Sequence, residues 1–113
     1  MIYMDNAATT RLSGRALEAM MPYLTEQYAN PAGTYSFTHA SNAAMEKARK
    51  QVADVIGAKS AEIFFTSGGT ESDNWALKGT MRANEKKGRH LIISAIEHHA
   101  ILHSAKALER EGF

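Results

Sequence analysis

The stretch Phe65-Thr66-Ser67-Gly68-Gly69-Thr70-Glu71-Ser72-Asp73-Asn74 decides the fold of this 113-residue chain. A short apolar, β-favouring run at 62–66 leads into it, and a helical pattern at 71–86 follows it. A second apolar run at 90–96 then precedes a helical pattern at 99–111. Strand, helix, strand and helix with short connections predict a βαβ unit, and hence an α/β fold.

Two further helices are expected before this unit. The first follows Ser13 and has apolar residues at helical spacing, namely Leu17, Met20, Met21, Leu24 and Tyr28. The second follows Ser41, which we predict to be its N-cap, and ends at Gly57. Parallel sheets are normally covered on both faces and contain about 5–6 strands. We therefore expect residues 1–12 to be an extended arm and residues 13–113 to be an incomplete part of a larger α/β domain.

Composition excludes several classes of function. The chain has 13 Lys and Arg against 12 Asp and Glu, and this net charge of +1 gives no footprint for nucleic acid or anionic membranes. It contains no cysteine, which excludes a disulfide framework, a thiolate metal site and a cysteine nucleophile within these residues. No apolar run approaches the roughly 20 residues of a membrane span, and the N-terminus does not resemble a signal peptide. We expect a cytoplasmic protein.

The two glycines at 68 and 69 suggest a site for phosphate. Glycine lets the backbone approach a ligand closely, and the helix that follows offers unpaired N–H groups and the positive end of its dipole. Thr70 adds a hydroxyl donor at the same place, so Gly69 and Thr70 together would form a phosphate cradle. The alternative is a tight turn in which Thr70 or Ser72 only caps the helix. The glycine motifs of dinucleotide and triphosphate sites are absent.

His98 lies at the carboxyl end of the second apolar run, and the glycine loop lies at the carboxyl end of the first. Ligands of open α/β sheets bind outside these strand ends, so both segments would face one crevice. His98 could stack on a planar cofactor or transfer a proton near neutral pH. The alternative is an exposed or hydrogen-bonded histidine at a helix start. A metal site is not expected, because His98, His99 and His103 lack the spacing of a histidine metal motif.

The sequence resembles the N-terminal portion of a cysteine desulfurase of the NifS/IscS type, within the class V aminotransferase group of fold-type I pyridoxal-phosphate enzymes. The resemblance runs from Tyr3 to the last residue. Four blocks in this order carry it, namely 3–10, Asn30-Pro31, 65–74 and Glu97-His98-His99-Ala100. It implies that the α/β unit is part of the large domain of such an enzyme.

The resemblance also implies roles for particular residues. Gly69 and Thr70 would hold the phosphate of pyridoxal 5'-phosphate, and His98 would stack on the pyridine ring and assist proton transfer. Asn6 and Ala7 would lie near the active-site entrance. The lysine that binds the cofactor, the aspartate that pairs with its ring nitrogen and the sulfur-carrying cysteine come later in the family's sequences. We therefore expect the 113-residue chain alone to be inactive.

The implied reaction of the parent protein converts L-cysteine to L-alanine and an enzyme-bound persulfide, for iron–sulfur cluster or thiolation pathways. Its partners would be a sulfur-acceptor or scaffold protein and a second copy in a homodimer, with no nucleic acid or membrane. Two alternatives stay open. One is a selenocysteine lyase or another class V enzyme, and the other is a non-catalytic truncated module that binds phosphate or associates with itself.

Overall fold

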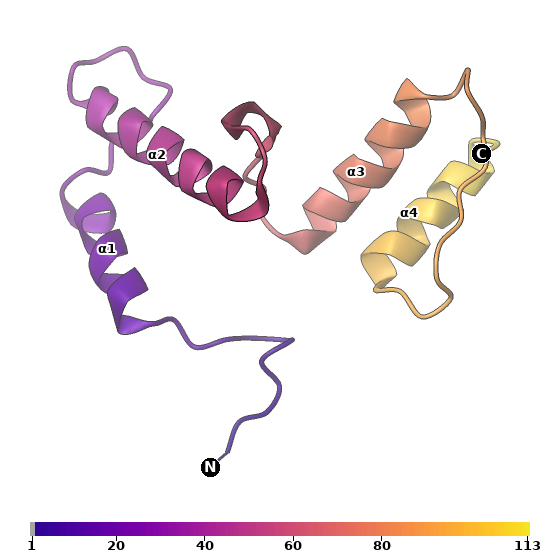
Figure 1. The fold of residues 1–113 in the computed structure, drawn as a ribbon, viewed down its shortest axis with the longest axis horizontal. Coiled ribbons are helices and arrows are strands. Elements are labelled where there is room, and N and C mark those ends of the chain that lie inside the picture. Colours follow the sequence, from indigo (N-terminus) through magenta and orange to yellow (C-terminus); the bar gives the residue numbers. More distant parts are fainter. Residues whose placement is uncertain (1) are drawn as a thin grey trace. The chain divides into compact units, whose positions relative to one another are not determined.

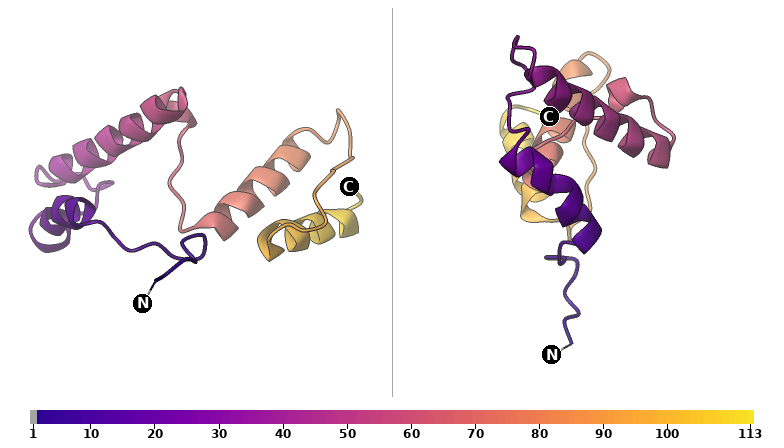
Figure 2. Two further views of the ribbon diagram at one scale, coloured as in Figure 1. Left: turned by 60° about the horizontal axis from the view of Figure 1, so that its bottom comes forward. Right: turned by 90° about the vertical axis from the view of Figure 1, so that its left-hand side faces the viewer.

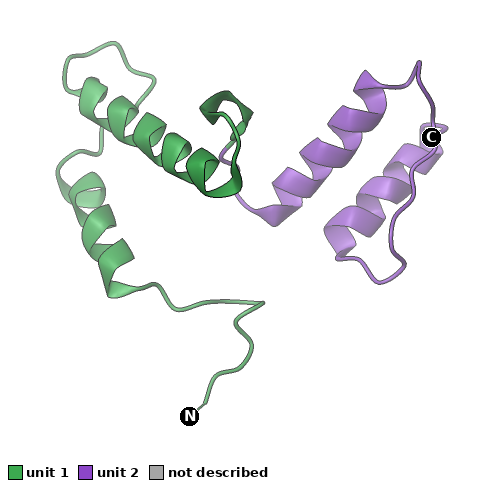
Figure 3. Cartoon of the chain, viewed as in Figure 1, with its two compact units in different colours: residues 1–64 green, residues 65–113 purple. Residues whose placement is uncertain are grey.

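The structure, a computed structural model, describes residues 2–113, which fold as helices joined by loops (Figure 1). They divide into two compact units at the peptide bond between Phe64 and Phe65 (Figure 3). Unit 1 lies before this bond and contains α1, α2 and a short 3-10 helix, η1. Unit 2 lies after it and contains α3 and α4. None of the helices in the described residues is both long and apolar enough to cross a membrane.

The first helix of unit 1, α1 (Gly14–Thr25), confirms the helix predicted after Ser13. The hydroxyl oxygen of Ser13 accepts a hydrogen bond from Ala16 N–H at 3.2 Å, which satisfies one of the open donors at the helix start. The helix ends before Tyr28, although the apolar pattern extends that far. Between Ile2 and Ser13 the chain forms a turn and no helix or strand. The division into an arm and a domain stays a prediction.

The second helix, α2 (Thr38–Ile56), starts earlier than the sequence pattern predicts. The prediction that Ser41 is its N-cap was wrong: Ser41 lies inside the helix and its hydroxyl donates to the carbonyl of Gln27 at 2.9 Å. The helix begins at Thr38, which is buried and whose hydroxyl donates to the carbonyl of Gly33 at 2.9 Å. A Cβ on Gly33 would lie 2.8 Å from Thr38 Cγ2, so the preceding loop packs onto Thr38 only because Gly33 lacks a side chain.

Gly57 ends α2, as the sequence predicts. It has a φ of 69° in the left-handed region, which glycine adopts without the steric cost that a Cβ would bring. The short η1 (Ser60–Glu62) follows and packs against α2. Arg49 of α2 donates through Nη1 to the carbonyl of Ile63 at 2.6 Å, which ties the end of η1 to the helix.

In unit 2, α3 (Gly69–Ala83) and α4 (His99–Arg110) lie side by side (Figures 1 and 2). The buried apolar residues of this unit are Met81 of α3 and Ala100 and Leu108 of α4. The predicted helix at 99–111 is confirmed almost residue for residue. The helix predicted at 71–86 is confirmed with both ends moved toward the N-terminus.

The two predicted strands do not form. Among residues 2–113 there is no β-strand, so the α/β fold and its βαβ unit are not realised in these residues. The segment 90–96 is a loop in which Ile92 and Ile96 are 82% and 95% exposed. Ile63, in the first predicted strand, has extended backbone angles of φ −102° and ψ 127°. A strand needs a neighbour for its N–H and C=O groups, and no second strand is present here to pair with either segment.

Candidate functional site

The first turn of α3 presents free backbone donors. The first hydrogen bond of this helix runs from Ser72 N–H to the carbonyl of Gly68 at 3.2 Å, so the N–H groups of Gly69, Thr70 and Glu71 have no partner within the helix. No side chain among residues 2–113 caps this end. Gly68 has a φ of +159°, which residues with a side chain rarely adopt. Such a helix start carries the positive end of the helix dipole and can bind an anion.

The space beside these donors is open. A Cβ on Gly69 would meet nothing within 4 Å, so a ligand can approach the backbone at this residue. The hydroxyl of Thr70 makes no hydrogen bond to any other group of the described residues. A phosphate at this position could therefore accept bonds from two backbone N–H groups and from the threonine hydroxyl.

The loop before α3 is held by the carboxylate of Glu71. Its Oε2 accepts hydrogen bonds from the Ser67 backbone N–H at 2.6 Å and from the Ser67 hydroxyl at 2.7 Å. These bonds, the hydroxyl bond first, lower the pKa of Glu71 below its ordinary value of 4.5 because they stabilise the charged form. The carboxylate thus binds the loop, and the donors of Gly69 and Thr70 stay available.

His98 forms the N-cap of α4 through its own ring. Its Nδ1 accepts a hydrogen bond from Ala100 N–H at 3.1 Å. An accepting Nδ1 carries no proton, so in the neutral ring the proton lies on Nε2, which faces away from this bond. The hydrogen bond therefore sets both the orientation of the ring and the nitrogen that is left for a ligand.

Thr70 and His98 line the same cavity in unit 2, which has a volume of about 310 Å³ and lies between the N-terminal halves of α3 and α4. Ser104 also lines it, and the Ser104 hydroxyl is buried without a hydrogen-bond partner in the part of the chain that the structure describes. The full lining consists of Thr70, Asn74, Lys78, His98, His99, Ala100, His103 and Ser104.

These groups fit a ligand that combines a phosphate with a planar ring. The open donors of α3 and the hydroxyl of Thr70 suit the phosphate, and the ammonium of Lys78 adds a positive charge to the cavity wall. The imidazole of His98 offers a flat face of fixed orientation. Pyridoxal phosphate has both parts, so the residues present are compatible with it.

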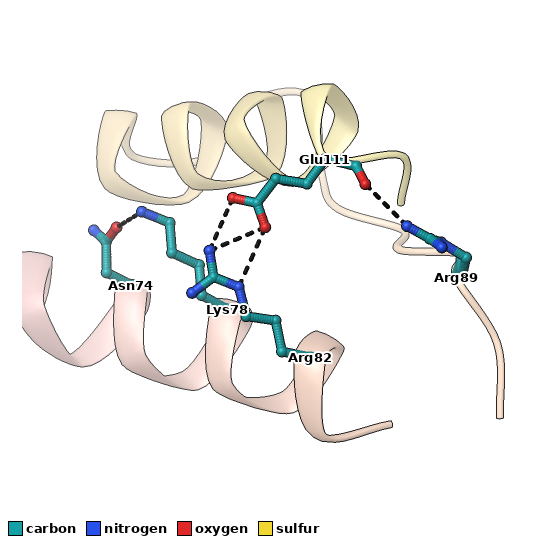
Figure 4. A network of polar contacts seen from close by, with 5 residues as sticks. All are labelled: Asn74, Lys78, Arg82, Arg89 and Glu111. Carbon is teal, nitrogen blue, oxygen red and sulfur yellow. Dashed lines mark hydrogen bonds and ion pairs between the residues drawn. The ribbon is translucent and has the colours of Figure 1, made fainter. Parts of the chain in front are cut away.

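The far ends of the two helices are joined by charged groups (Figure 4). Arg82 of α3 donates through Nε and Nη2 to the carboxylate of Glu111, with a shortest distance of 2.8 Å. Arg89 donates to the carbonyl oxygens of Glu111 and Gly112, both at 2.9 Å, and its guanidinium lies 4.7 Å from the ring centroid of Phe113. The Arg82 bonds hold the end of α4 against α3 from the end opposite to the cavity, and the Arg89 contacts hold the loop after α3 against the last residues of the chain.

The structure brings together the three site residues predicted from the sequence. Gly69 opens α3, and Thr70 and His98 line one cavity, all within unit 2. Their roles toward a cofactor stay predictions. Sequence reasoning missed Lys78 and Ser104. The four-residue spacing of Thr70, Asn74 and Lys78 puts these three on one helix face, and this spacing could have indicated Lys78.

The described residues hold no cluster of three or more His, Cys, Asp or Glu side chains that could bind a metal ion. His99 and His103 do stack, with ring centroids 5.5 Å apart, but they form only a pair.

Two solved structures share the fold of this chain. The chain superposes on a NifS-like protein with a TM-score of 0.89 and 45% identity, over 96% of this chain and 30% of the other. It superposes on SspA in complex with cysteine with a TM-score of 0.86 and 37% identity, over 95% and 31% of the two chains.

The sequence comparisons identify the family. The family model for aminotransferase class V matches residues 2–113, so the chain belongs to this family. It is 54% identical to the cysteine desulfurase IscS of Methanosarcina thermophila and 53% identical to that of Clostridium botulinum strain Kyoto, over 112 residues in each case. These alignments cover 99% of this chain but only 28% of the length of each relative.

Proposed function

We propose that this chain provides the phosphate cradle and the ring-stacking histidine of a cysteine desulfurase that uses pyridoxal phosphate. One observation supports the proposal. In a chain that is 54% identical to a cysteine desulfurase, Thr70, at the start of α3 with its open N–H donors, and His98 line one cavity. The parent protein would convert L-cysteine to L-alanine and pass the sulfur to an acceptor. Because these 113 residues contain no cysteine, the persulfide would form on a cysteine outside them.

In this proposal the backbone N–H groups of Gly69 and Thr70 and the Thr70 hydroxyl bind the cofactor phosphate. His98 stacks on the ring, with its orientation fixed by the bond from Ala100 N–H, and its protonated Nε2 can donate a hydrogen bond or a proton toward the substrate. When bound, pyridoxal phosphate supplies an electron sink for the substrate's Cα.

The proposal also includes the α/β fold. Residues 62–66 and 90–96 would become neighbouring strands of a parallel sheet once other strands lie beside them. The extended backbone at Ile63 and the exposed apolar side chains of Ile92 and Ile96 support this, because such side chains suit a strand covered on both faces. A homodimer, a sulfur-acceptor or scaffold protein and a cytoplasmic location complete the proposal, and these three parts are supported by the resemblance alone.

The experiment compares the protein expressed from its natural gene with its Thr70→Ala variant. When it is loaded with pyridoxal phosphate and supplied with a thiol reductant, we expect the unchanged protein to release alanine from cysteine, and sulfide as the thiol reduces the persulfide. The variant should bind the cofactor about tenfold or more weakly, because a lost hydrogen bond to a charged group costs roughly 1.5–3 kcal/mol. Titration of the apoprotein, followed by absorbance, measures the dissociation constant.

Thr80→Ala is the matched control, since Thr80 is an exposed threonine of the same helix but does not line the cavity. It should leave cofactor binding unchanged. Equal dissociation constants for the Thr70 and Thr80 variants would contradict the phosphate role of Thr70. A parent protein that binds no pyridoxal phosphate, or releases no sulfide from cysteine, would contradict the proposed activity.

A further inference from the structure

Two side chains on the cavity side of α3 form a chain of hydrogen bonds that the proposed function does not use. Lys78 Nζ donates to Asn74 Oδ1 at 2.7 Å (Figure 4), and Asn74 Nδ2 donates to the carbonyl of Thr70 at 2.9 Å. Asn74 and Lys78 are both half-buried. We call this pair of bonds, from Lys78 through Asn74 to Thr70, the α3 relay.

The direction of the relay follows from its chemistry. An ammonium group has three donors and no acceptor, so Lys78 can bind only the oxygen of the Asn74 amide. The NH₂ end of that amide is then directed to an acceptor, which is the Thr70 carbonyl. Both bonds therefore donate toward the N-terminus of the helix, and neither can be reversed.

A competing acceptor for Lys78 is already bound elsewhere. The carboxylate of Glu111 is near enough for Lys78 to help lower its pKa, but Arg82 occupies it with three hydrogen bonds. The planar guanidinium matches a carboxylate better than an ammonium does. Lys78 is left to Asn74, as Figure 4 shows.

The relay ends on the peptide group that carries one of the open donors. The Thr70 carbonyl and the Glu71 N–H belong to one planar peptide unit, so a bond that fixes the carbonyl also fixes the N–H. A donor at the carbonyl oxygen also withdraws electron density from the peptide and makes its N–H a stronger donor. Chains of hydrogen bonds polarise one another in this way by roughly 10–30% per bond.

We propose that Lys78 and Asn74 are positioning residues that orient and polarise the Thr70–Glu71 peptide, so that the open Glu71 N–H adds a third backbone donor for the cofactor phosphate beside those of Gly69 and Thr70. This inference rests on the proposed function, because it assumes that a phosphate binds at Thr70. It adds two cavity-lining residues whose effect on the phosphate passes through the backbone. Asparagine is a poor residue for a helix interior, and a role of this kind accounts for its presence at position 74.

The test uses the protein expressed from its natural gene and measures its dissociation constant for pyridoxal phosphate. Asn74→Ala should raise this constant about fivefold or more, since one charge-assisted chain is lost. The matched control is Asn84→Ala: Asn84 Nδ2 donates to the Thr80 carbonyl at 2.9 Å in the same geometry, at the opposite end of α3. The control should change the constant less than about twofold, within the usual effect of a surface substitution.

A double-mutant cycle separates the relay from a charge that acts through space. Lys78→Met should weaken cofactor binding in the unchanged protein but have little further effect in the Asn74→Ala variant, because Asn74 carries its influence. Lys78→Arg, which keeps a cationic donor, should restore part of the affinity. The ³¹P shift of the bound cofactor should move in Asn74→Ala but stay unchanged in Asn84→Ala, which a purely structural role would not produce.

Three outcomes would overturn the relay. The first is equal cofactor affinity in Asn74→Ala and Asn84→Ala. The second is an effect of Lys78→Met that persists in full in the Asn74→Ala variant. The third is a loss of affinity that the fall in the melting temperature of the apoprotein fully accounts for. If Thr70→Ala weakens binding while Asn74→Ala does not, only the relay fails; if Thr70→Ala has no effect, the proposed phosphate site fails with it.

Discussion

Glu111 is the residue through which the C-terminal ends of α3 and α4 meet. Its side chain accepts from Arg82, and its backbone carbonyl accepts from Arg89. The hydrogen bonds from Arg82 are the largest cause of the lowered pKa of Glu111, and the same bonds raise the pKa of Arg82. Both side chains are largely exposed, so salt screens their attraction. The contact therefore fixes the position of the two helix ends relative to each other and adds little to stability.

The lowered pKa of Glu111 predicts a pH dependence of stability. Above the ordinary value of 4.5 the carboxylate is charged in both states and the ion pair with Arg82 is intact. As the pH falls through the lowered pKa of the folded state, the unfolded state binds more protons and the stabilisation is lost. Glu111→Gln should therefore have a melting temperature that depends less on pH between about pH 3 and pH 6 than that of the unchanged protein.

Glu109→Gln is the control for this measurement, because Glu109 lies in the last turn of α4, two residues before Glu111, and makes no ion pair within the described residues. It should leave the slope of melting temperature against pH close to that of the unchanged protein. A slope that is the same in Glu111→Gln and in Glu109→Gln would show that the pair with Arg82 does not contribute.

At the scale of a single element, the end of α2 depends on one backbone conformation. Gly57 has a φ of 69°, and a Cβ there would meet nothing within 4 Å, so any cost of Gly57→Ala arises from the backbone alone. We expect a loss of about 1–2 kcal/mol in the free energy of unfolding, the cost of the left-handed region for a residue with a Cβ. Urea titration followed by circular dichroism measures it.

Gly88→Ala serves as the comparison, since Gly88 also has open space around it but does not have a positive φ. Alanine there should be neutral or stabilise by up to about 1 kcal/mol, because it restricts the unfolded chain. If both substitutions changed stability equally, the left-handed conformation would not be what makes glycine necessary at position 57.

The helices differ in how well the sequence predicts them, and the reasons are local. The end of α2 at Gly57 and the helix at 99–111 are predicted correctly. A glycine after a helix and apolar residues at helical spacing are patterns that can be recognised within a few residues of sequence. The start of α2 was predicted wrongly because it depends on the loop that packs onto Thr38, which no periodicity reveals. The start of α3 at Gly69 precedes the first apolar residue of its pattern.

The sequence predicts which residues of the candidate site lie together, but not the elements that bring them together. Thr70 and His98 were expected to meet at the carboxyl ends of two strands. They line one cavity without any strand in the described residues, because the paired helices α3 and α4 bring them together. Lys78 was not predicted, since its place in the cavity depends on how the helices face each other.

At the scale of the whole molecule, the proposed strands can be tested by hydrogen exchange. In the protein expressed from its natural gene, the amides of residues 91–95 should exchange slowly if they pair with neighbouring strands. In a polypeptide of residues 1–113 the same amides should exchange as in an unstructured loop, because no strand pairs with them. Mass spectrometry measures the exchange rates in both polypeptides, with the amides of α4 as an internal reference. Fast exchange of 91–95 in both samples would reject the strand at 90–96.

The α3 relay has a consequence for the order of folding. Its two bonds join residues four positions apart, whereas the pair between Arg82 and Glu111 spans 29 positions. A contact of such low sequence separation needs no long loop to close, so the relay can form as soon as α3 winds, on the roughly microsecond timescale of helix formation. The donors at the start of α3 would then be oriented before α4 docks and brings His98 to the cavity.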